Sequence, residues 1–92
     1  AIRRSPNMLS AYNNRGAVRL EKDDIEAAIA DFSEAIRLDP QLAEPYKRRA
    51  RAYDKVGQRR AAAQDFRKCL ELDPDDTQAH EIREYISRWG GE

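Results

Sequence analysis

The only cysteine and the only histidine of this 92-residue chain are candidates for nucleophilic catalysis, but they are not adjacent in the sequence. Cys69 is the single cysteine and His80 the single histidine. A cysteine becomes a nucleophile when a neighbouring base or cation favours its thiolate, and no histidine lies near Cys69 in the sequence. We therefore interpret Cys69 as a small buried core residue, and His80 as a packing residue, partly buried at a helix contact.

Signatures of ligand binding are equally sparse. Asp73, Asp75 and Asp76 lack the spacing and the glycine of a calcium loop, and negative charge there favours the N-terminus of a helix. Gly90 and Gly91 suit the end of a helix. A lone cysteine with no ligand cluster around it does not make a metal site. The sequence predicts no enzyme activity, no cofactor and no metal.

Two arginine–aspartate pairs recur with the same spacing. Arg15 precedes Asp31, and Arg49 precedes Asp65, by sixteen residues in each case. In an antiparallel hairpin of helices that turns midway, each arginine is about level with its aspartate. We predict that each pair bridges the two helices, with the arginine stem over apolar surface. The alternative is that both arginines reach toward a ligand.

The elements that must hold these pairs repeat along the chain. The tripeptide Leu-Asp-Pro ends at Pro40 and again at Pro74, 34 residues later. Nine of the 34 positions in residues 9–42 are identical in residues 43–76. Self-similarity at a fixed period is typical of a solenoid, in which each unit buries its apolar face against the next.

Each repeat contains two stretches of apolar residues at helical spacing, and Asp-Pro ends the second stretch. A further stretch of the same kind follows the second repeat. The sequence therefore predicts an all-α fold, an α-solenoid of antiparallel helix hairpins. The five expected helices cover about residues 8–21, 25–38, 42–55, 59–72 and 76–89.

A 34-residue unit of two helices resembles the tetratricopeptide repeat. That family's pattern has a large aromatic residue, a Leu-Gly pair and a tyrosine, then Ala-x-x-x-Phe and a final proline. The chain departs from it at Arg15 and Arg49, where leucine is usual, and at Arg19, where tyrosine is usual. The residues that match are Tyr12, Gly16, Ala28, Phe32 and Pro40 in one repeat, and Tyr46, Ala50, Tyr53, Ala62, Phe66 and Pro74 in the other.

The resemblance divides the chain into two full repeats, 8–42 and 43–76, followed by a C-terminal capping helix and tail, 77–92. Residues 1–7 align with the end of a repeat, and we interpret them as the remnant of a preceding one. His80 falls at the position equivalent to Tyr12 and Tyr46, which is why we expect it to be partly buried.

The resemblance also implies a scaffold that binds other proteins, with a concave groove lined by the first helix of each repeat. Such a face suits an extended, acidic peptide, because amides bond its backbone and cations meet its carboxylates. The fifth helix adds Gln78, Glu81, Ile82 and Tyr85 to this side. The predicted groove residues, polar and locally basic, are Asn13, Asn14, Ala17, Lys47, Arg48, Arg51 and Lys55.

Family members that hold the acidic tails of heat-shock chaperones use lysine, arginine and asparagine at set groove positions. Asn14 and Arg48 match that set, but Glu44 stands where a lysine is expected, so we do not predict a chaperone clamp. Two alternatives to peptide binding stay open. One is a structural spacer or self-assembly segment of a larger repeat protein, and the other is a charged face that is merely solvated.

Charge and hydropathy narrow the class of partner. Lys plus Arg and Asp plus Glu number 17 each, so the net charge is zero and no global field attracts nucleic acid or an anionic membrane. No apolar run reaches the ~20 residues that span a bilayer. We expect another protein or peptide as partner and a soluble, preferably cytoplasmic, location. We also expect a weak homodimer through an apolar N-terminal edge at Met8, Leu9, Ala11 and Val18.

Overall fold

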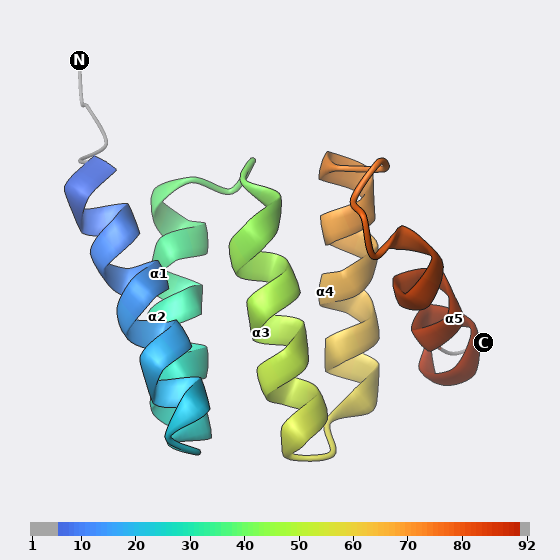
Figure 1. Ribbon diagram of the computed structural model, residues 1–92, viewed down its shortest axis with the longest axis horizontal. Helices are drawn as coiled ribbons and strands as arrows, with labels where there is room; N and C mark the ends of the chain where they lie inside the picture. Colours follow the sequence, from blue (N-terminus) through green and yellow to red (C-terminus); the bar gives the residue numbers. More distant parts are fainter. Residues whose placement is uncertain (1–5, 91–92) are drawn as a thin grey trace.

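The computed structural model describes residues 6–90, and this part of the chain forms five α-helices and no strand (Figure 1). The all-α prediction is confirmed. The helices are α1 (Pro6–Glu21), α2 (Ile25–Leu38), α3 (Ala43–Lys55), α4 (Arg59–Leu72) and α5 (Ala79–Trp89). None of them is long and apolar enough to cross a membrane.

The helices pair as hairpins that repeat along the molecule. α1 packs against α2 and α3 against α4, while α2–α3 and α4–α5 contacts join one unit to the next. Figure 1 shows the resulting row, with α5 beside α4 at the C-terminal end. Each hairpin turns through one residue in the left-handed conformation, Asp23 with φ 68° and Gly57 with φ 81°. These two residues lie one repeat apart, so the 34-residue period extends to the turns.

The core is built from one phenylalanine per repeat set among small side chains. Phe32 has no exposed surface and Phe66 keeps 7%. A Cβ atom placed on Gly16 would lie 2.6 Å from Cε1 of Phe32, so the first hairpin crosses too closely there for any side chain. Small residues at corresponding positions of the two repeats, where helices pack closely, are fully buried. They are Ala28, Ala35, Ala50, Ala62 and Cys69.

The fifth helix differs from the prediction in its start and in its rotation. It begins at Ala79, because the Oδ1 atom of Asp76 accepts the backbone N–H of Gln78 at 2.7 Å and holds residues 76–78 in a turn. The expectation that His80 is partly buried was wrong, since its side chain is 85% exposed and lies beside Glu84. The helix turns its apolar stripe of Ala79 and Ile82 inward, and that rotation carries the neighbouring His80 into solvent.

Candidate interaction surface

Both arginine–aspartate pairs form the bridges that the sequence predicts. Arg15 donates from Nε and Nη2 to the two carboxylate oxygens of Asp31, at 2.9 and 2.8 Å. Arg49 donates in the same way to Asp65, at 2.7 and 2.8 Å. The hydrogen bonds from Arg15 hold the pKa of the Asp31 carboxyl below its usual value. These two arginines are therefore occupied inside their hairpins.

The predicted groove residues of α1 are mostly uncharged and differ in exposure. Asn14 is exposed, whereas Asn13 and Ala17 are partly buried. The Oδ1 atom of Asn13 is buried and has no hydrogen-bond partner within residues 6–90. A buried acceptor of this kind is uncommon, because leaving it unpaired costs about 1–3 kcal/mol.

On α3, two of the predicted cations already have acidic partners. The amine of Lys47 donates to Asp76 at 2.7 Å and to the side-chain oxygen of Gln78 at 3.1 Å. Its side chain is only 18% exposed, so this bridge fixes the loop before α5. The hydrogen bond from Lys47 also holds the pKa of Asp76 below its usual value. Arg48 pairs with Glu44 one turn earlier on the same helix.

The other two predicted groove cations of α3 are exposed and form no ion pair within residues 6–90. Arg51 is exposed, and its guanidinium donates to the neutral side-chain oxygen of Gln78. Lys55 is exposed at the end of the helix. Within residues 6–90, neither of them has a carboxylate at ion-pair distance. Arg51 and Lys55 are one helical turn apart, and they form a pair of exposed positive charges without a direct ion pair in residues 6–90, although Arg51 also helps to lower the pKa of Asp76.

The α5 helix forms the facing wall and carries aromatic side chains. The hydroxyl of Tyr85 donates to Asp54 of α3 at 2.6 Å, and the Tyr85 ring meets Phe66 edge-on at 5.0 Å. Arg59 lies 4.6 Å from the centre of the Trp89 ring. Tyr85 was expected on this side. Trp89 was not, although its spacing of four residues from Tyr85 places both on one helix face.

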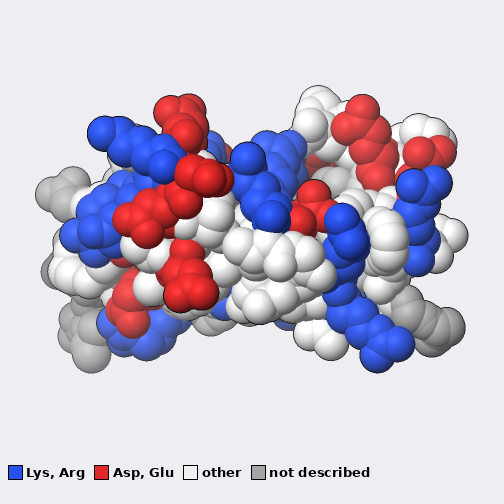
Figure 2. Space-filling view, turned by 90° about the horizontal axis from the view of Figure 1, so that it is seen from below, with Lys and Arg blue, Asp and Glu red and all other residues white. Residues whose placement is uncertain are grey.

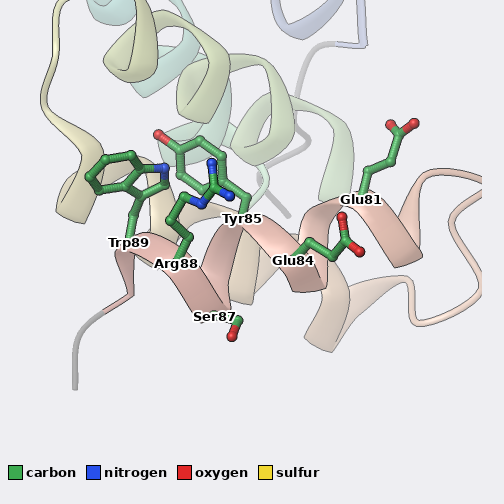
Figure 3. Close-up of a pocket in the computed structure, with 6 residues that line it drawn as sticks. All are labelled: Glu81, Glu84, Tyr85, Ser87, Arg88 and Trp89. Carbon is green, nitrogen blue, oxygen red and sulfur yellow. The ribbon is translucent and has the colours of Figure 1, made fainter.

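Two open hollows lie along this wall. The smaller, of about 150 Å³, lies between α3 and α5 and is lined by Arg51, Phe66, Gln78, Glu81, Ile82 and Tyr85. The larger, of about 580 Å³, lies along α5 and shares Glu81 and Tyr85 with the first. Figure 3 shows its lining, in which Tyr85, Arg88 and Trp89 point to one side of the helix while Ser87 points away.

Charges of both signs are mixed over the molecule. In the view from below in Figure 2, lysine and arginine side chains are mixed with aspartate and glutamate, and neither sign covers the face. Recognition by charge is therefore local, because dissolved salt screens exposed charges that are more than about 10 Å apart at 0.1 M ionic strength. No group of three His, Cys, Asp or Glu side chains in the described part of the chain is placed to hold a metal ion.

The comparisons with known proteins agree with this architecture. Two models described as tetratricopeptide repeat match the chain, one over residues 33–87 and the other over residues 10–42. The chain belongs to the tetratricopeptide repeat family. Among solved structures, it is similar to the first TPR of Spaghetti (RPAP3) bound to the HSP90 peptide SRMEEVD. That likeness has a TM-score of 0.80 at 23% sequence identity, and it covers 90% of this chain and 67% of the other. No curated protein sequence matches.

As a tetratricopeptide repeat protein, the chain is an interaction module whose first helices, α1 and α3, carry the predicted groove residues. The α5 helix continues their row, but its rotation puts Ile82 rather than His80 against the core. The sequence did not identify Asp76 and Gln78 as partners of the groove cations. The sequence feature that could have identified them is the short acidic loop directly before a helix, which offers oxygen acceptors to any nearby lysine or arginine.

The N-terminal edge of α1 carries a third hollow. It has a volume of about 260 Å³ and is lined by Met8, Ala11, Tyr12 and Arg15. One repeat later, the residue equivalent to Ala11 is Pro45, which is fully buried in the second repeat. Val18, on the same helix, is 48% exposed. This edge of the tetratricopeptide repeat module is thus less covered than the corresponding edge of the second repeat.

Proposed function

We propose that this chain holds an extended peptide of another protein, with acidic side chains, along the groove side of α1, α3 and α5. The observation that carries the proposal is the pair Arg51 and Lys55, two exposed cations of α3 without a carboxylate partner in residues 6–90. Asn14 adds an exposed amide on α1. The similar Spaghetti domain is bound to the peptide SRMEEVD, which contains two glutamates and ends in an aspartate.

The chemistry of such a complex is straightforward. A carboxylate that replaces water at Arg51 gains charge-assisted hydrogen bonds, and the exposed amide of Asn14 can pair with the peptide backbone. Because the site is open to solvent, the affinity should be modest and should fall as salt is added. Binding of this kind needs no catalytic group. We accordingly propose a non-catalytic module whose partner is neither a nucleic acid nor a membrane.

A charge-reversal pair tests this proposal. Binding of a fluorescent acidic peptide is measured by anisotropy for the double variant Arg51→Glu with Lys55→Glu. The matched control is Arg60→Glu with Arg83→Glu, which changes the net charge equally at two exposed arginines outside the groove set. We expect the first variant to lose binding and the control to retain it, with helicity unchanged in both. Equal losses would show a general charge effect and would refute the groove assignment.

A second function, self-assembly, is favoured by the hollow at the N-terminal edge. A two-fold dimer could cover Met8, Ala11 and Val18 with the same residues of a second copy, since exposed apolar patches favour association. Arg15 lines the same hollow and is 55% exposed, so like charges would keep the dimer weak.

Sedimentation at increasing protein concentration tests the dimer. Val18→Glu should suppress association, whereas Val56→Glu, at a comparably exposed valine in the second hairpin turn, should not. A monomer at millimolar concentration would contradict the proposal. Because the groove and the edge use different residues, each function can fail while the other holds.

A further inference from the structure

The hollow between α3 and α5 has an apolar floor and a charged rim. Phe66, Ile82 and Tyr85 form its floor, and Arg51, Gln78 and Glu81 surround it. Phe66 and Ile82 keep only 7% and 4% of their surface exposed, so what they expose is directed into this opening. A small apolar floor enclosed by polar groups is the usual arrangement of a site that takes one side chain of a ligand.

The floor is held in place before any ligand arrives. The hydroxyl of Tyr85 is bonded to Asp54 at 2.6 Å, and its ring is packed edge-on against Phe66. Burial, reinforced by this hydrogen bond, raises the pKa of the Tyr85 phenol. A side chain that enters therefore does not have to order the residues that receive it, which lowers the entropic cost of binding.

The rim has a positive side and a negative side. The side-chain oxygen of Gln78, directly before α5, accepts from both Lys47 and Arg51, so the Arg51 guanidinium of α3 is held at the Gln78 end of the opening. Glu81 lies on the α5 side, is exposed, and has no ion-pair partner in the described part of the chain. Arg88, seven residues further along α5, lines the larger hollow together with Glu81 but forms no ion pair with it within residues 6–90.

The acidic side of the rim continues into the larger hollow. Glu81 and Glu84 both line it and stand on the same stretch of α5 in Figure 3. Glu84 is 71% exposed, with His80 as its neighbour at 3.3 Å. A peptide carrying acidic residues along its whole length would place like charges against this wall, which opposes binding.

We propose, on the basis of the peptide-binding function above, that the preferred ligand is a segment of mixed charge. An apolar side chain enters the hollow over Ile82 and Tyr85. An acidic residue on one side of it meets Arg51 and Lys55, and a basic residue on the other side meets Glu81. The stem of that basic residue lies over the Tyr85 ring, as long cationic side chains commonly do on aromatic surface.

The test compares three labelled peptides of equal length. The first has glutamates on one side of a central leucine and lysines on the other, and it is made in two versions with opposite residue order. The second replaces the leucine with serine, and the third replaces the lysines with glutamates. We expect the first peptide, in one of its directions, to bind wild-type protein about two- to fivefold more tightly than the third, the contribution of one exposed ion pair. The serine peptide should also bind more weakly than the first.

A charge exchange on α5 completes the test. In the variant Glu81→Lys the preference should reverse, so that the wholly acidic peptide binds more tightly than the mixed one. The control is Glu71→Lys, at an exposed glutamate of α4, which should leave the preference unchanged. Circular dichroism verifies that both variants remain helical.

The outcomes separate the two proposals. If the acidic peptide binds wild-type protein as tightly as the mixed one and Glu81→Lys affects both equally, the mixed-charge proposal is overturned while acidic-peptide binding survives. If binding of the mixed peptide does not depend on its leucine, the hollow is not the anchor site and the proposal fails. If no peptide binds, both proposals fall together.

Discussion

Arg49 joins three helices through a single guanidinium. From α3 it donates two hydrogen bonds to Asp65 of α4, and its Nη1 atom donates to the Ser33 hydroxyl of α2 at 3.0 Å. Its guanidinium also lies 5.7 Å from the centre of the Tyr53 ring. The side chain thus replaces the leucine expected at this position with directed polar contacts. The bonds to Asp65 close one hairpin, and the bond to Ser33 links that hairpin to the preceding repeat.

We predict that Arg49→Ala lowers the free energy of unfolding by about 3 kcal/mol, the low end for breaking a buried ion pair. The loss arises because Asp65, whose side chain is 8% exposed, would remain buried without its cation. Arg49 itself keeps 21% of its side-chain surface in water, which places the estimate at the low end. Urea unfolding followed by circular dichroism measures the change.

The first repeat provides the control for that prediction. Arg15→Ala should cost clearly less than Arg49→Ala, because Arg19 also bonds Asp31, at 3.1 Å, and remains after the substitution. Arg15 is in addition 55% exposed, so water already screens its charge. Equal losses in the two variants would show that Arg19 does not compensate for the loss of Arg15, since Asp31 and Asp65 are similarly buried.

We predict that the packing around Phe32 tolerates neither a smaller side chain at position 32 nor a larger one at Gly16. Phe32→Ala should cost about 3–5 kcal/mol, as for other buried aromatic residues, and should largely unfold a domain this small. Gly16→Ala should also destabilise, because a clash costing about 1–3 kcal/mol outweighs the ~1 kcal/mol gained in helix propensity. Thermal melting distinguishes these outcomes, and a Gly16→Ala melt above that of wild type would contradict the packing argument.

Stability should decline on the acid side of pH 4. The pKa values of Asp31 and Asp76 are lowered in the folded chain, chiefly by hydrogen bonds from Arg15 and Lys47. As the pH falls, the unfolded chain therefore binds protons before the folded chain does, at the ordinary aspartate pKa of about 3.9. The contribution of both groups is complete above that pH and is lost as the pH falls through their folded pKa values. Urea midpoints from about pH 6 to pH 2 measure the loss, which Asp76→Asn should reduce.

Cys69 should be unreactive until the protein unfolds. Its side chain has no exposed surface, and burial raises the pKa of its thiol above the ordinary value. We expect a thiol reagent to modify it roughly a hundredfold or more slowly in native protein than in urea, since access requires an opening of the core. Rapid labelling in native buffer would mean that α4 opens independently of the rest.

The sequence could predict the hairpins, the small residues at helix crossings and both arginine–aspartate bridges, because the second repeat repeats each of them. Arg15 and Asp31 alone would be a coincidence of spacing. Arg49 and Asp65 in the same register make a bridge the simplest explanation. Periodic features are predictable because every copy must satisfy the same packing.

What the sequence could not predict lies where the period ends. The exposure of His80 depends on the rotation of α5, and equivalence to Tyr46 gives the wrong face. Lys47 was expected to face a ligand, yet the path of the loop before α5 brings Asp76 and Gln78 to its amine. The path of an irregular loop is set by tertiary contacts, which local residue patterns do not encode.

The two arginine–aspartate bridges also constrain how this repeat can evolve. If a leucine replaced Arg49 alone, the Asp65 carboxylate would stay buried without a counter-ion, and loss of Asp65 alone would strand the guanidinium. Replacing both with apolar residues avoids either penalty. The ancestry of such a repeat should therefore show the two positions changing together, so that related sequences carry the pair or lack it. A relative that keeps only the aspartate should provide a second cation nearby, as Arg19 does for Asp31 in the first repeat.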